Sequence, residues 1–143
     1  MADFTTLKAK VVAKLQEQTS WFESSAQVLQ YEPEMATEIA DPYAVVLASG
    51  NDNDFASTSE NKRTYAFRIR LYMERKTRGA SKAETDLQTL VDALIDAFDQ
   101  DYTLGGTALI SRAVPSAWGY ILGEKEYRTA EIVIKAMTWF DVT

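Results

Sequence analysis

The stretch KRTYAFRIRLYMER, residues 62–75, decides the fold. Successive side chains of a β-strand point to opposite faces of a sheet. The odd positions here are mostly apolar and the even positions mostly polar, namely Arg63, Tyr65, Phe67, Ile69, Leu71 and Met73 against Thr64, Ala66, Arg68, Arg70, Tyr72 and Glu74. No helical period fits the stretch as well. The pattern predicts a long strand in a sheet that buries one face.

Two amphipathic helices are predicted, one on each side of this strand in the sequence. Apolar residues recur at spacings of three and four over residues 4–18, and Asp3 or Thr5 is placed to cap the start. A second apolar stripe ends near residue 98. Its helix is expected to begin at Ser81, which would form a capping box with Glu84.

Further strands are predicted before and after the central one. Ala26–Tyr31 and Tyr43–Ala48 precede it, and residues 107–122 and Glu126–Asp141 follow it. Pro115 should interrupt the third of these strands, because proline cannot donate to a sheet ladder. The order indicates an α+β fold, a mostly antiparallel sheet of four to five strands with two helices packed on it. All 143 residues are expected to form one domain.

The segment before the central strand, residues 49–61, is predicted to be a long polar loop. It is rich in Gly, Asn, Asp and Ser, which favour turns. Asp52 and Asp54 lack the glycine and the later glutamate of an EF-hand loop, so a plain polar loop is expected rather than a calcium site. A loop of this length is expected to be mobile or to take part in docking.

Composition excludes several functional classes. The chain has no cysteine and no histidine, which rules out disulfides, thiolate or imidazole metal sites and Ser-His-Asp triads. Its net charge of -6 argues against general binding of nucleic acid. No apolar run approaches the ~20 residues of a membrane span. The N-terminus lacks the basic-then-apolar order of a signal peptide, so synthesis in the cytoplasm is expected.

Charge is segregated along the chain. Residues 61–80 carry seven basic and one acidic side chain, whereas residues 81–105 carry one basic and six acidic side chains. Two interpretations stay open. The basic surface of one copy could meet the acidic surface of another copy, or both surfaces could simply be solvated.

Three aspartates, Asp96, Asp99 and Asp101, gather at the C-terminal end of the second predicted helix. The helix dipole disfavours negative charge at that end. Either solvent or a cation from elsewhere, such as Arg68 or Arg70 of a neighbouring copy, is expected to offset it.

The last predicted strand has a partly apolar outer face that includes Val133, Met137 and Trp139 beside Lys135. Such a face is expected to be buried against another protein chain or beneath the first helix. Both alternatives stay open at this point.

Four segments follow one another in the C-terminal part of the chain: LIDAF at 94–98, LGGT at 104–107, RAVPSAWGY at 112–120 and YRTAEIVI at 127–134. With the central strand and the polar loop before it, this order resembles the tail terminator (tail completion) proteins of long-tailed bacteriophages. The resemblance covers residues 42–143, and it covers the first helix by position only.

The resemblance implies a structural function in the virion. Proteins of that family form a six-membered ring on the last ring of the tail tube, stop its polymerisation and provide the surface to which the head is joined. The implied partners are further copies of the chain, the tail tube protein and the head–tail connector protein, with DNA passing through the lumen without specific binding. No enzymatic activity, cofactor or metal is implied. The implied location is the head-proximal end of the tail, after assembly in the host cytoplasm.

The candidate contact residues are Asp52, Asp54, Phe55, Arg63, Arg68, Arg70, Asp99, Asp101, Lys135 and Trp139. Exposed strand edges invite pairing between subunits, and ring closure would use them up. One alternative is another head–tail connector or a tail-tube protein. The other is a small enzyme or ligand-binding module, with aspartates as its carboxylates and Arg68 and Arg70 as an anion clamp.

Overall fold

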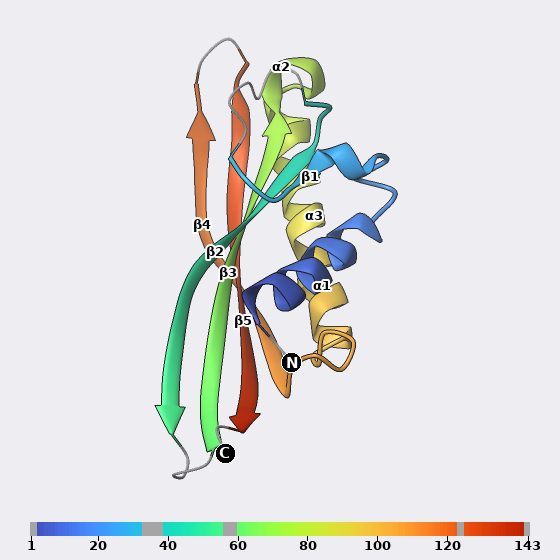
Figure 1. Ribbon diagram of the computed structural model, residues 1–143. Coiled ribbons are helices and arrows are strands. Elements are labelled where there is room, and N and C mark those ends of the chain that lie inside the picture. Colours follow the sequence, from blue (N-terminus) through green and yellow to red (C-terminus); the bar gives the residue numbers. More distant parts are fainter. Residues whose placement is uncertain (1–2, 33–38, 56–59, 123–124, 142–143) are drawn as a thin grey trace.

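The computed structural model describes residues 3–32, 39–55, 60–122 and 125–141, and it describes only the backbone of residues 51–55, 60, 61, 140 and 141. The elements follow one another as α1 (Phe4–Gln16), the short 3-10 helix η1 (Ser25–Gln27), β1 (Val28–Leu29), β2 (Tyr43–Phe55), β3 (Glu60–Glu74), α2 (Arg75–Arg78), α3 (Ala80–Gln100), β4 (Ile110–Ile121) and β5 (Tyr127–Asp141). Figure 1 shows one tall, twisted sheet with the helices on one side of it. The predicted α+β class is confirmed, and α2 is an unpredicted single turn. None of the described helices is long and apolar enough to cross a membrane.

The five strands form one sheet in the order β1-β2-β3-β5-β4. Among the described strands, only β1 and β2 run parallel, and every other neighbouring pair is antiparallel. The central strand is β3, which pairs with β5 over its whole length, from Glu60 opposite Asp141 to Glu74 opposite Tyr127. The predicted long strand and the mostly antiparallel sheet are therefore confirmed.

The odd-numbered side chains of β3 face the helices and form the centre of the core. Tyr65 is 3% exposed, and Phe67, Ile69, Leu71 and Met73 are fully buried. Leu7, Val11 and Leu15 of α1, Leu87, Leu90 and Leu94 of α3 and Ala130, Ile132, Ile134 and Ala136 of β5 pack with them. The alternation in the sequence thus predicts correctly which side of the strand is buried.

The starts of the two long helices differ in how well they were predicted. Asp3 caps α1, because its Oδ1 accepts the N–H of Thr6 at 2.8 Å. The predicted capping box of Ser81 and Glu84 is wrong. Helix α3 begins one residue before Ser81, its N-cap is Gly79 with a φ of 88°, and no side chain caps it. A glycine adopts this backbone angle without steric cost, so it can turn the chain into the helix where Ser81 was expected to cap it.

The predicted polar loop over residues 49–61 is largely wrong. Strand β2 continues through Phe55, and its outer half pairs with β3 from Gly50 opposite Ala66 onward. A β-bulge at Ala48 and Gly50 shifts the register there. Cross-strand pairing satisfies the backbone of polar residues as well as that of apolar ones, so polar composition does not prevent a strand. Residues 56–59 lie outside the described part of the chain.

Two other strand predictions are partly or fully confirmed. The strand expected at Ala26–Tyr31 is reduced to the two residues of β1, with η1 before it. The interruption expected at Pro115 is confirmed as a register shift between Pro115 and Trp118 within β4. Such bulges are common where an edge strand carries a proline.

Candidate functional site

One face of the sheet carries none of the described helices and is called here the bare face. It consists of the even positions of β3 and the odd positions of β5, together with the residues of β2 and β4 that pair with them. Because α1 and α3 pack on the other face, the interpretation that the outer side of β5 lies beneath the first helix is wrong. Lys135 and Trp139 are exposed on the bare face, Trp139 to 48%.

Arg68 and Arg70 lie in the middle of the bare face, where carboxylates of the same chain pair with both of them. Arg70 donates to Glu131 at 2.9 Å and to Glu32 at 2.6 Å. Arg68 Nε lies 3.5 Å from the second oxygen of Glu131. Burial lowers the pKa of Arg70, but its hydrogen bonds to Glu131 and Glu32 outweigh this and hold the pKa above the ordinary value. The prediction that these arginines pair with aspartates of a neighbouring copy is therefore no longer supported.

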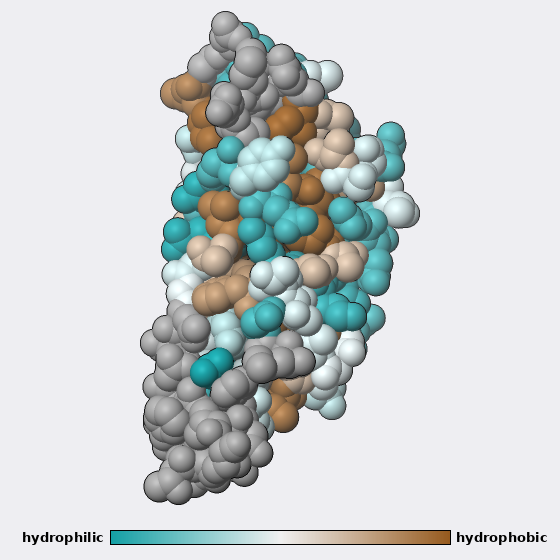
Figure 2. All heavy atoms as spheres, viewed as in Figure 1, coloured by the Kyte–Doolittle hydropathy of each residue, from teal (hydrophilic) through white to brown (hydrophobic). Residues whose placement is uncertain are grey.

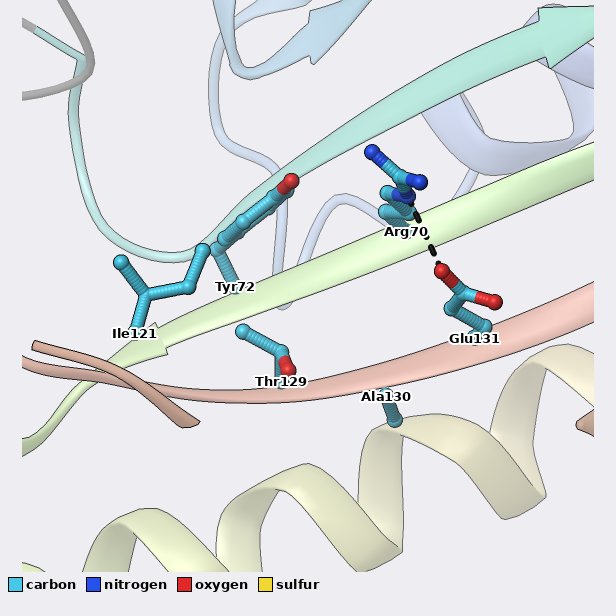
Figure 3. Close-up of a pocket in the computed structure, with 6 residues that line it drawn as sticks. All are labelled: Arg70, Tyr72, Ile121, Thr129, Ala130 and Glu131. Carbon is cyan, nitrogen blue, oxygen red and sulfur yellow. Dashed lines mark hydrogen bonds and ion pairs between the residues drawn. The ribbon is translucent and has the colours of Figure 1, made fainter. Parts of the chain in front are cut away.

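A shallow pocket of about 180 Å³ opens beside the ion pair of Arg70 and Glu131. Figure 3 shows Arg70 and Glu131 joined on one side of it and Tyr72 and Ile121 on the other. Tyr72 stacks on Tyr43 with ring centroids 4.4 Å apart, and burial raises the pKa of both phenols. The phenols stay protonated at neutral pH and the ion pair is internally neutralised. The pocket therefore offers packing and hydrogen bonds rather than acid–base chemistry.

The arginines after β3 are also paired within the chain. Arg78 donates to Asp41 at 2.7 Å and to Asp86 at 2.6 Å. Arg75 lies 3.7 Å from Glu126. Folding therefore compensates much of the charge segregation that the sequence displays.

Among the aspartates at the end of α3, Asp101 is held inside the chain. Its Oδ1 accepts the N–H of Gly105 at 3.0 Å, and its Oδ2 lies 3.1 Å from Lys14 Nζ. For Asp101 the charge is therefore offset by a cation from elsewhere, but that cation is Lys14 of the same chain and not Arg68 or Arg70 of a neighbouring copy. Asp96 and Asp99 are exposed, and no ion pair engages them within the described ranges.

Replacing Asp101 with alanine is expected to lower the free energy of unfolding by about 1 kcal/mol near neutral pH. The amide of Gly105 and then Lys14 lower the pKa of Asp101 below its ordinary value. This stability is therefore present above the unfolded-state pKa and is lost as the pH falls through the folded-state pKa. Urea unfolding should show a gap between wild type and variant that shrinks in acid. Asp96→Ala is the control with little effect, and an Asp101→Ala gap that does not change with pH would contradict the assignment.

The remaining candidate residues do not form one site with the others. Arg63 lies opposite the buried Thr138 of β5, on the helix side of the sheet and away from Lys135. The side chains of Asp52, Asp54 and Phe55 lie outside the described part of the chain. No group of acidic side chains that could hold a metal ion occurs among the described residues.

The sequence prediction missed β4 as a candidate surface. Strand β4 is an edge of the sheet, and no described strand pairs with its outer side. The exposed apolar side chains along this edge, here called the β4 surface, are Ile110 (44%), Val114 (40%), Trp118 (42%), Tyr120 (58%) and Ile121 (43%). The register places Ile110, Val114 and Ile121 on the bare face, whereas Trp118 and Tyr120 lie on the helix side, opposite Ala130 and Arg128. Figure 2 shows hydrophobic residues at the surface over the upper end of β4. A signal was present in the sequence, because apolar residues occupy both odd and even positions of this strand.

Arg128 of β5 holds the two aromatic rings of the β4 surface. Its guanidinium lies 5.2 Å from the ring centre of Trp118 and 4.5 Å from that of Tyr120. It also donates to the carbonyl of Gly119 at 2.9 Å and to Glu84 of α3. Rigidly supported Trp, Tyr and Arg side chains are typical of the residues that dominate binding energy at protein interfaces.

Pro115 limits what the β4 edge can do. The N–H of Ser111 points away from β5 and donates to the carbonyl of Tyr102. Alternate residues of a strand share this direction, so Pro115 faces the same open side and has no N–H to offer. The edge is therefore poorly suited to unlimited strand addition. Contacts at β4 are left to its side chains.

The chain matches no protein-family model, and no curated protein matches its sequence. Function must therefore be inferred from the surfaces of the fold and from the order of segments that resembles the tail terminators.

Proposed function

We propose that this protein is a structural protein of a phage virion, which forms a closed ring on the end of the tail tube. The ring ends polymerisation of the tube and presents the surface that joins the head through its connector. The six copies per ring and the location at the head-proximal end come from the resemblance to tail terminators. No catalytic activity is part of the proposal.

The β4 surface is the observation that carries the proposal. Monomeric proteins rarely leave an apolar edge strand open, because it invites association. The opposite edge of the sheet is formed by β2, which β1 covers only at Ala44 and Val45. A contact between β4 and any other surface of the next copy is heterologous, and such contacts either close into a ring or continue as a filament. Closure would occupy every β4 surface and so end addition.

The end of the ring that meets the tube or the connector is proposed to be built by β2, β3 and β5. Figure 1 shows these strands extending beyond the helices at the lower end of the molecule. In this proposal, the paired strands β2 and β3 take the docking role that was expected of a polar loop over residues 49–61. The pairing of β2 with β3 continues out to Phe55 opposite Asn61, so this end of the molecule is formed by paired strands.

Size exclusion with light scattering over a range of concentrations, followed by negative-stain imaging, tests the proposal. Closed rings of one size are expected, and added tail tubes should acquire one ring at an end and stop elongating. Long stacked cylinders would instead indicate a tail-tube protein. A chain that neither forms rings nor binds the ends of tail tubes would contradict the proposal.

The enzyme alternative has no specific observation in its favour. Its anion clamp would need Arg70, which Glu131 and Glu32 already engage. Its carboxylate Asp101 is bound to Lys14 on the helix side, away from the bare face.

A further inference from the structure

We propose that helix α3 of one copy docks on a basic groove beside β4 of the next copy. The groove is lined by Arg112, Val114, Pro115, Ser116, Val133 and Lys135 and has a volume of about 270 Å³. Its partner is an acidic stripe on α3, made of Asp92, Asp96 and Asp99. The inference rests on the proposed function, because it names the contact that joins neighbouring subunits of the ring.

The groove carries two unneutralised cations. Arg112 and Lys135 are direct cross-strand partners in the register of β4 and β5, and both are exposed. Like charges directly opposite each other destabilise a sheet. No ion pair within the described part of the chain engages either of them. Beside them, the next cross-strand pair on the same face, Val114 and Val133, supplies an apolar floor.

The acidic stripe has the matching property. Asp92, Asp96 and Asp99 are spaced by four and three residues, which places them on one face of α3, and all are exposed. Like charges at these spacings destabilise a helix. Among the described residues, no cation pairs with any of the three. Each surface is thus improved by a partner of opposite charge.

The spacings of the two surfaces agree. Cross-strand partners have Cβ atoms roughly 4.5–5.5 Å apart, and helix residues three or four apart have Cβ atoms roughly 5–6 Å apart. Asp96 and Asp99 can therefore meet Arg112 and Lys135 two against two. The apolar floor favours a protein surface over nucleic acid, because bringing hydrated phosphates against two valines costs desolvation free energy.

The positions of the two surfaces require a contact between copies. The groove lies on the bare face, whereas α3 lies on the helix side, as Figure 1 shows for the sheet and its helices. One copy therefore cannot fill its own groove with its own stripe. The contact is heterologous, as a ring requires, and of the β4 surface it covers Val114, which lines the groove.

A charge exchange tests the inference on the full chain. Arg112→Glu with Lys135→Glu makes the groove acidic, and Asp96→Lys with Asp99→Lys makes the stripe basic. Each double variant alone should lose about 100-fold or more in association constant, because like charges then face each other. An equimolar mixture should assemble again, since each groove meets the opposite stripe and an even-numbered ring can alternate the two variants. Lys10→Glu with Lys76→Glu changes the net charge by as much as the groove variant and should assemble like wild type.

Light scattering and imaging give the assembly, and circular dichroism confirms that each variant is folded. Double variants that assemble like wild type, or a mixture that stays dissociated, would overturn this contact while the ring itself stands. A wild type that stays monomeric up to its highest soluble concentration would also overturn it, and binding to tail-tube ends would then decide the proposed function separately. A labelled DNA duplex could instead bind wild type and fail to bind the groove variant, while assembly stays unchanged. That result would overturn the helix contact and show that nucleic acid occupies the groove.

Discussion

Replacing Trp118 with serine is expected to weaken the association of subunits by roughly 30-fold or more at each contact. Truncating a dominant interface residue costs about 2 kcal/mol or more, and every 1.4 kcal/mol is about tenfold in affinity. Trp118 is 42% exposed, and the guanidinium of Arg128 lies over its ring, so the ring is held in place and still available to a partner. The measurement is the concentration at which rings dissociate, followed by light scattering.

The same substitution should leave the folded chain nearly as stable as before, which separates an interface effect from a folding defect. Tyr31→Ser is the matched control, because Tyr31 is an aromatic residue 65% exposed that lies outside β4. It should not change the dissociation concentration. If Trp118→Ser rings were as stable as wild-type rings, the β4 surface would not be the subunit interface.

Replacing Phe67 with alanine is expected to lower the free energy of unfolding by about 3–5 kcal/mol, the usual range for removing a buried phenylalanine. Phe67 is fully buried at the centre of β3, where its ring meets that of Phe4 of α1 edge-on at 5.8 Å. Its loss leaves a cavity between the sheet and the first helix. Urea unfolding followed by circular dichroism measures the change.

The neighbouring residue supplies the control for this prediction. Arg68 follows Phe67 in β3 but lies on the bare face, where its Nε is 3.5 Å from Glu131. Arg68→Ala should therefore cost about 1 kcal/mol or less. If Phe67→Ala fails to fold, Phe67→Leu keeps most of the volume and should show a smaller loss in the same direction. Equal losses at positions 67 and 68 would contradict the one-sided sheet.

Local patterns predicted the central elements of the fold well. The period of two in residues 62–75 identified β3 and its buried face, and Pro115 marked the bulge in β4. Both features depend on neighbours within a few residues, so a local pattern contains the information. The capping box at Ser81 was wrong because Gly79 let α3 start one residue earlier.

The candidate surfaces were harder to predict, for a physical reason. Arg70 was expected to face another copy, but its partner Glu131 lies 61 residues further along the chain. Asp101 likewise meets Lys14 of α1. Ion pairs between distant segments depend on the register of strands and the packing of helices, and no local pattern specifies either.

The sequence by itself determined which residues alternate between core and surface, because side-chain direction in a strand follows from backbone geometry. It also excluded chemistry that needs cysteine or histidine. Only the tertiary structure decided that β4 lies at an open edge. It also decided that the charges of Arg70 and Asp101 are neutralised by residues of the same chain. The same long-range arrangement leaves Arg112 and Lys135 on one side of the molecule and Asp96 and Asp99 on the other, because the helices cover a single face of the sheet.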